Sequence, residues 1–142
     1  TETLDREVKT EEIYQCLLDT YVVDSEPYRL VDYDLLTGRE QDQRCVARVA
    51  VSENTLTIDG EGSGPIEAFV TALGETLNEP VTILSYQEVA IGTGSDAQAI
   101  CIVSIEDREE GQRCYGIGLS RNTTTTAFNA VISAMNRRWS NS

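Results

Sequence analysis

Two stretches decide the fold: IEAFVTALGETL at residues 66–77 and FNAVISAMNRRW at residues 128–139. Both have the apolar spacing of an amphipathic helix. A shift of 62 residues carries the five apolar positions of the first segment onto five of the second without a gap, and it also carries Ala68 onto Ala130. The five matched pairs are Ile66 and Phe128, Phe69 and Val131, Val70 and Ile132, Leu73 and Met135, and Leu77 and Trp139. The spacing predicts two copies of one helix.

Each helix is preceded by three short stretches in which apolar and polar residues alternate as they do in strands. The predicted strands cover 28–36, 44–51 and 54–59 in the first half and 81–90, 97–105 and 113–119 in the second. This order predicts an α+β fold of two βββα units that form a sandwich-like domain. Because three strands and one helix leave one face of a sheet uncovered, we expect a symmetric homodimer.

The N-terminal part predicts one more helix, over residues 10–23, with Thr10 as its N-cap. Residues 24–27, Asp-Ser-Glu-Pro, break the pattern and predict a linker. We therefore divide the chain into an N-terminal helix and linker at 1–27, the end of a preceding subdomain, and a domain at 28–142.

The composition excludes several classes of function. The chain has 142 residues, with 11 Lys and Arg against 24 Asp and Glu, and a formal net charge of −13. Such a chain is unsuited to nucleic-acid phosphates or to an anionic membrane surface, which bind clustered cations. Histidine is absent from the sequence, which excludes a Ser-His-Asp or Cys-His catalytic apparatus and histidine-ligated metals. We expect neither nucleic acid nor membrane as a partner, and no cofactor.

The cysteines predict a reducing compartment. They stand at positions 16, 45, 101 and 114, without a CxxC pair, so reduced thiols in a cytoplasmic protein are favoured over two disulfides. The acidic first residues do not resemble a signal peptide. The sequence also contains no apolar run near the roughly 20 residues that cross a bilayer.

Three polar stretches are candidates for ligand binding. The glycine-rich run 60–65 stands between a predicted strand and a helix, where free N–H groups receive a carboxylate or phosphate. Residues 121–126 precede the second helix, and Asn122 or Thr123 is suited to cap it. The loop 92–97 leads into small alanines that leave room for a short branched side chain. A tight turn, a capped helix and a hairpin loop explain the same stretches, and a solvated surface explains the carboxylate pairs.

Five short motifs follow one another along the chain. They are GSGPIEAF (62–69), LSYQEVA (84–90), GTGSDAQA (92–99), YGIGL (115–119) and AVISAMNR (130–137). Together they resemble the C-terminal regulatory domain of 2-isopropylmalate synthases, over about residues 28–139. The resemblance implies a duplicated βββα fold, a homodimer, and L-leucine bound at the dimer interface. It also implies that leucine inhibits a catalytic TIM barrel of the same parent chain, which condenses acetyl-CoA with 2-oxoisovalerate. This chain would then be a sensor without a catalytic site.

The resemblance also implies a set of ligand-binding residues. The head group of leucine would be held by Gly62, Ser63, Gly64 and Pro65, with Ser120 and Arg121 nearby. The aliphatic side chain would be surrounded by Ile66, Ile83, Tyr86, Ala90, Ala97, Ala99 and Leu119. The chain departs from the family at Ser63, where Asn is common, at Val89, where His is common, and at Cys114-Tyr115, where an apolar-Trp pair is common.

Three alternatives stay open at this point. The chain could be the isoleucine-sensing domain of a citramalate synthase, because leucine and isoleucine differ in the placement of one methyl group, which is worth roughly 1–3 kcal/mol. A dimerisation domain without a ligand would have the same fold. An independent enzyme is disfavoured by the lack of histidine and of a metal-binding pattern.

Overall fold

The chain forms two three-stranded antiparallel sheets, each followed by a helix. The structure is a computed structural model that describes residues 27–78, 81–92, 94, 97–107 and 111–141. Sheet A contains β1 (Tyr28–Thr37), β2 (Gln43–Val51) and β3 (Asn54–Gly62), with a short 3₁₀ turn η1 (Arg39–Gln41) after β1, and leads into α2 (Pro65–Leu77). Sheet B contains β4 (Val81–Ile91), β5 (Gln98–Asp107) and β6 (Arg113–Ser120), and leads into α3 (Thr123–Asn141). The predicted α+β fold of two βββα units is confirmed.

The predicted N-terminal elements lie almost entirely outside the described residues. The helix expected over residues 10–23 is among them, and so is the segment 1–27 apart from Pro27. The carbonyl of Pro27 accepts a hydrogen bond of 3.0 Å from the backbone N–H of Ser52, which ties the start of β1 to the β2–β3 turn. The division of the chain after residue 27 stays a prediction.

The helix ends follow the predicted signals. The helix α2 begins at Pro65, whose fixed φ suits a first helical residue, and is followed by Asn78 in the left-handed conformation (φ 55°, ψ 42°). At the start of α3, the side-chain Oδ1 of Asn122 accepts a hydrogen bond of 3.0 Å from the N–H of Thr125. Of the two caps suggested by the sequence, the structure uses Asn122.

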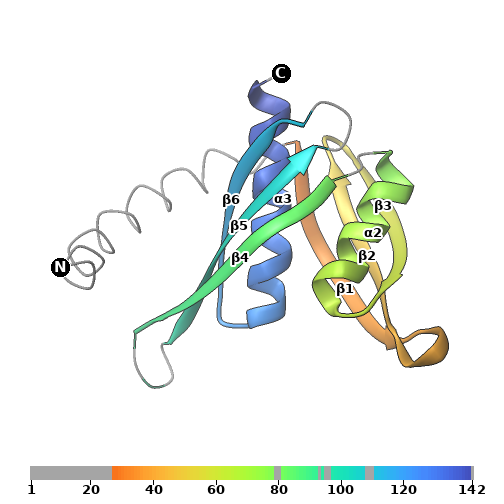
Figure 1. Cartoon of the computed structure of the whole chain (residues 1–142), viewed down its shortest axis with the longest axis horizontal. Coiled ribbons are helices and arrows are strands. Elements are labelled where there is room, and N and C mark those ends of the chain that lie inside the picture. Colours follow the sequence, from red (N-terminus) through yellow and green to blue (C-terminus); the bar gives the residue numbers. More distant parts are fainter. Residues whose placement is uncertain (1–26, 79–80, 93, 95–96, 108–110, 142) are drawn as a thin grey trace.

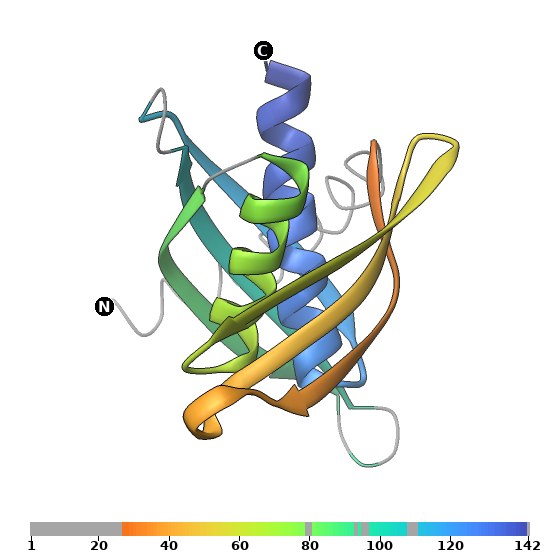
Figure 2. The ribbon, with the colours of Figure 1, turned by 90° about the vertical axis from the view of Figure 1, so that its right-hand side faces the viewer.

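The two helices lie between the two sheets (Figures 1 and 2). The helix α2 packs on β2 and β3 and also touches β4, whereas α3 packs on β5 and β6 and also touches β1. The helices contact each other as well. Each helix therefore belongs to the core of both halves, and the first strand of each half meets the helix of the other half.

Glycines in the third strand of each half let the helices approach closely. A Cβ at Gly60 would lie 2.4 Å from the backbone N of Ala72, and a Cβ at Gly116 would lie 2.2 Å from the backbone N of Ala134. The same 62-residue shift relates the two alanines. The two halves therefore also share a mode of packing, in which the backbone of the third strand lies directly against the backbone of the following helix.

The run 60–65 differs from its prediction as a loop, because its first half belongs to a strand. Strand β3 continues to Gly62, and a Cβ there would lie 2.6 Å from the backbone N of Ala68. Gly60 and Gly62 are thus required by the packing of α2 on the sheet. This leaves Ser63 and Gly64 as the connection between β3 and α2.

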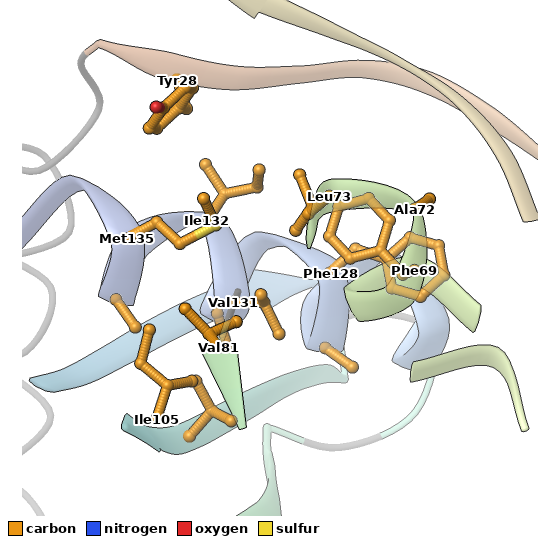
Figure 3. Packing of buried hydrophobic residues seen from close by; sticks show 14 of the residues in the cluster. Tyr28, Phe69, Ala72, Leu73, Val81, Ile105, Phe128, Val131, Ile132 and Met135 are labelled. Carbon is orange, nitrogen blue, oxygen red and sulfur yellow. The ribbon is translucent and has the colours of Figure 1, made fainter. Parts of the chain in front are cut away.

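One apolar core joins the two halves (Figure 3). At its centre the rings of Phe69 on α2 and Phe128 on α3 stack, with centroids 4.2 Å apart and planes 6° apart. Both side chains are fully buried, so each contributes a large burial term to stability. Phe69 and Phe128 come from different copies of the repeat, so neither copy has a complete core alone.

The outer faces of the two sheets differ in character. On sheet A, Arg44 pairs with Asp59 and Arg48 pairs with Asp32, so this face is charged and exposed. Residues of sheet B that alternate with the glycines packed on α3 point away from that helix, and they are largely apolar. They include Ile100 and Ile117, which are buried, Ile102 and Leu119, which are half-buried, and Tyr115, which is 60% exposed. The outer face of sheet B is therefore apolar, and part of it is already buried within the single chain.

The described cysteines Cys45, Cys101 and Cys114 are buried and are not joined in a disulfide, whereas Cys16 lies outside the described residues. Burial raises the pKa of the Cys45 thiol and that of the Cys101 thiol to about 11, because the thiolate is poorly solvated in the core. These thiols are protonated at neutral pH and serve as small apolar side chains.

A buried asparagine fastens the start of β1 to the C-terminal helix. The side chain of Asn136 accepts a hydrogen bond from the N–H of Tyr28 and donates one to its carbonyl, each 2.9 Å long. Asn136 is fully buried, so both amide atoms are satisfied in a place where unsatisfied ones would be costly. This pairing joins residues 108 positions apart in the sequence.

Replacing Asn136 with alanine is expected to lower the free energy of unfolding by about 2 kcal/mol, because two buried backbone groups of Tyr28 lose these partners. Chemical denaturation followed by circular dichroism measures the change. Asn129→Ala on the same helix is the control, with an expected change within about 0.5 kcal/mol. Equal stabilities for the two variants would contradict the role given to Asn136.

Candidate functional site

A pocket of about 550 Å³ lies where the start of α2 faces strand β4. Its size falls within the range of small-molecule sites, which is about 300–1,000 Å³. It is lined by Ser63, Gly64, Pro65, Ile66, Glu67, Val70, Thr71, Thr82, Ile83 and Tyr86. The lining combines a helix start from the first half with a strand from the second, so the pocket exists only because the two halves pack together.

The helix start offers hydrogen-bond donors to this pocket. Gly64 is the N-cap of α2, and its position provides no side-chain hydrogen bond to the first turn. The first backbone bond of the helix runs from the N–H of Ala68 to the carbonyl of Gly64, at 2.9 Å. Pro65 has no N–H, so the donors left for a ligand are the N–H groups of Ile66 and Glu67. A carboxylate is the ligand group that such donors favour, because the helix dipole also attracts it.

Apolar side chains from both α2 and β4 form one wall of the pocket. Ile83 and Tyr86 come from β4, and Ile66 and Val70 come from α2. Tyr86 is 55% exposed, although its ring stands on the face of sheet B that is directed at the helices. This wall suits an aliphatic group, since covering these side chains removes apolar surface from water.

Glu67 is the charged residue of the lining. Its Oε2 accepts hydrogen bonds from the N–H of Ser63, at 3.4 Å, and from the hydroxyl of Ser63. The carboxylate is thereby held beside the first turn of α2. Since the lining contains neither Lys nor Arg, the pocket combines one fixed negative charge with the positive end of a helix dipole.

The start of α3 provides an internal comparison. Thr125, the counterpart of Ser63 under the 62-residue shift, has its hydroxyl 2.7 Å from the hydroxyl of Tyr33. Tyr33 also packs edge-on against Phe128, with centroids 4.7 Å apart. The first strand of one half therefore covers the helix start of the other half here.

Tyr33 and Tyr86 occupy similar places in their own halves. Each follows by two residues the irregular position of the first strand, which is Val31 in β1 and Leu84 in β4. Tyr33 fills the space at the start of α3 with its own hydroxyl, whereas Tyr86 borders an open pocket at the start of α2. Of two similar helix starts, one is closed by the chain and the other is open to a ligand.

The structure brings together about half of the predicted site residues. The pocket is lined by Ser63, Gly64, Pro65, Ile66, Ile83 and Tyr86. Gly62 is adjacent in sequence, but it packs against the backbone of α2 and is not among the lining residues.

The other predicted residues lie at the far end of sheet B. Ala90, Ala99 and Ser120 are register neighbours across β4, β5 and β6, and Leu119, Arg121 and Ala97 are close to them in sequence. Arg121 is exposed, and Ala99 is buried. Within one chain these residues do not line the pocket at α2. Part of the loop 92–97 lies outside the described residues.

Four lining residues were missing from the predicted set: Glu67, Val70, Thr71 and Thr82. Glu67 stands four residues after Ser63, so one helical turn places the two side chains together. Val70 and Thr71 follow on the same helix. The sequence therefore contained a signal for Glu67, whereas Thr82 required knowledge of how β4 packs against α2.

A second pocket, of about 690 Å³, lies at the same end of sheet A, beside the turn between β1 and β2, and is a weaker candidate. It is lined mainly by polar and charged residues. Arg44 in this pocket donates a hydrogen bond to Asp59 and thereby lowers the pKa of the Asp59 carboxyl group. The side chain of Glu61 accepts a hydrogen bond from the backbone N–H of Arg39. The charged groups largely satisfy one another, and an apolar wall is lacking.

The part of the chain that the structure describes contains no cluster of three or more His, Cys, Asp or Glu side chains able to hold a metal ion. Within the same residues, none of the helices has the length and apolar character needed to cross a bilayer.

The chain is similar to known proteins along nearly its whole length. A family profile described as the LeuA allosteric (dimerisation) domain matches residues 7–139. The chain is 30% identical to the 2-isopropylmalate synthase of Clostridium acetobutylicum, 31% to that of Brucella suis and 35% to that of Pseudomonas entomophila. These alignments cover 96% of this chain and 24–25% of each relative. The chain thus spans about a quarter of the length of the curated relatives that it matches.

Proposed function

The chain belongs to the LeuA allosteric (dimerisation) domain family, and we propose that it is the leucine-sensing regulatory domain of a 2-isopropylmalate synthase. In this proposal the domain forms a homodimer, binds L-leucine and inhibits the condensation of acetyl-CoA with 2-oxoisovalerate in a catalytic barrel of the same parent chain. The domain itself has no catalytic site and needs no cofactor, and the enzyme works in the cytoplasm.

The observation that carries the proposal is the chemistry of the pocket at the start of α2. A zwitterionic amino acid has a carboxylate for the N–H groups of Ile66 and Glu67, an ammonium group for the Glu67 carboxylate, and a side chain for the apolar wall. The wall around Ile83 and Tyr86 contains apolar groups of a size that suits a short branched side chain. An aliphatic amino acid thus satisfies each part of the lining.

The remaining predicted residues enter the proposal through the dimer. Ala90, Ala99 and Ser120 adjoin one another on sheet B but do not line the pocket within one chain. A ligand at a dimer interface touches side chains of two copies. We therefore assign these residues, with Ala97, Leu119 and Arg121, to the part of the site that the second copy completes.

Feedback inhibition then follows from differential affinity. Leucine that binds one arrangement of the dimer better than another shifts the population toward the first. Since the same arrangement alters the barrel, the two sites are coupled by a free energy that is typically 1–3 kcal/mol. The lining of the pocket by both halves supports this scheme, because a ligand there contacts α2 and β4 at once.

Calorimetric titration of the chain with L-leucine, L-isoleucine and D-leucine tests the proposal. We expect L-leucine to saturate about one site per chain and to bind more tightly than the other two. Sedimentation of the same samples is expected to give a dimer.

Each alternative outcome has a distinct reading. Tighter binding of L-isoleucine would assign the chain to a citramalate synthase. A folded dimer that takes up none of the three amino acids would be a dimerisation domain without a ligand, and the proposed function would be wrong.

A further inference from the structure

We propose that Glu67 recognises the ammonium group of the bound amino acid, so that the site accepts α-amino acids and rejects 2-oxo acids and simple carboxylic acids with the same side chain. This inference rests on the proposed function. It assigns to one residue the discrimination between an amino acid and the keto acids from which amino acids are made by transamination.

The first observation is the charge of the lining. Glu67 supplies a negative charge, and neither Lys nor Arg lines the pocket. A ligand with a carboxylate and no ammonium group is attracted by the start of α2 but repelled by Glu67. A zwitterion meets both groups favourably, because its ammonium group pairs with the carboxylate.

The second observation is the fixed position of that carboxylate. Ser63 donates to Oε2 of Glu67 from both its N–H and its hydroxyl. Among the described residues, Oε1 of Glu67 has no hydrogen-bond donor, so it is available to a ligand. The side chain is therefore placed at the pocket before a ligand arrives, and less entropy is lost on binding.

The third observation comes from the other half of the repeat. The 62-residue shift carries Glu67 onto Asn129, which is neutral and lies beyond the first turn of α3, because α3 begins at Thr123. At that helix start the space is closed by Tyr33 and Thr125. The first turn of α2, at the open helix start, thus contains an acidic side chain, whereas the first turn of α3 contains none.

The test compares L-leucine with 4-methylpentanoate and 4-methyl-2-oxopentanoate, which keep the branched side chain and the carboxylate but lack the ammonium group. Calorimetry on the 142-residue chain is expected to show at least about 100-fold weaker binding of both analogues than of L-leucine. In Glu67→Gln, L-leucine is expected to bind about tenfold more weakly. The analogues are expected to bind as tightly as before or more tightly, so the discrimination falls to about tenfold or less.

Two further variants separate recognition from a structural role. Glu67→Asp keeps the charge and is expected to keep more of the discrimination than Glu67→Gln. Glu75→Gln, on the same helix but outside this pocket, is expected to leave all three affinities unchanged. Since Glu67 is exposed, circular dichroism of each variant is expected to match that of the unmodified chain.

The outcomes distinguish the two proposals. An unmodified chain that binds L-leucine and a Glu67→Gln variant with unchanged discrimination would overturn the role of Glu67 and leave the proposed function in place. An unmodified chain that does not bind L-leucine would overturn both.

Discussion

Replacing Gly118 with alanine is expected to lower the free energy of unfolding by at least about 3 kcal/mol. The added Cβ would lie 1.9 Å from the carbonyl oxygen of Thr126 and 2.7 Å from the backbone N of Ala130. All of these atoms belong to the backbone of α3, so the helix itself has to move, and the packing around it is lost. For a chain of this size the melting temperature is expected to fall by about 10 °C, as measured by thermal denaturation.

Gly64→Ser is the matched control for this substitution. A Cβ at Gly64 has no atom within 4 Å, and serine is a good N-cap residue. We expect its melting temperature to stay within about 3 °C of that of the unmodified chain. Similar losses in Gly118→Ala and Gly64→Ser would show that the close contact of β6 with α3 does not limit stability.

Replacing Gly64 with aspartate is expected to weaken the binding of L-leucine at least about 100-fold without a loss of stability. The backbone of Gly64 is extended (φ −148°, ψ 175°), and the space around a Cβ is free, so aspartate fits and can cap α2. Its carboxylate occupies the donors that the ligand carboxylate requires, and it repels that group. Calorimetry gives the affinity, and thermal denaturation without ligand gives the stability.

Gly64→Asn is the control for this prediction, because asparagine has nearly the same shape and also caps helices but carries no charge. We expect it to retain L-leucine binding within about tenfold. Gly62 is unsuitable for such a test, since a side chain there meets the backbone of α2 and would damage the fold. If Gly64→Asp bound L-leucine as tightly as Gly64→Asn, the ligand carboxylate would not lie at the start of α2.

The helices and strands were predictable because the apolar spacing of a helix and the alternation of a strand are both local features of the sequence. The apolar spacing of residues 66–77 and 128–139 placed the helices, and each predicted strand is present, one to three residues longer than expected. The continuation of β3 through Gly60 to Gly62 was missed. Glycine in a strand is locally unfavourable, and the close approach of α2 that requires it here is a tertiary contact.

The site was predictable in part, for a reason that the structure makes clear. Ser63 to Ile66 form one continuous stretch at a helix start, and general principles identify such a stretch as receptive to an anion. The assignment of Ile83 and Tyr86 depended on the family resemblance, because their meeting with α2 depends on how the two halves pack. Glu67 was missed since a single glutamate in a first helical turn is common in helices without ligands.

Because Tyr33 is bonded to Thr125, the helix starts of the two copies of the repeat have different structural roles. The start of α3 is covered by Tyr33 and helps to join the two halves. The start of α2 borders an open pocket. If the open pocket binds the proposed ligand, substitutions around Ile83 and Tyr86 are expected to change which ligand side chain fits, while the contact of Tyr33 with α3 continues to stabilise the fold. In evolutionary terms, a duplicated unit of this kind can change what it senses without first changing how it folds.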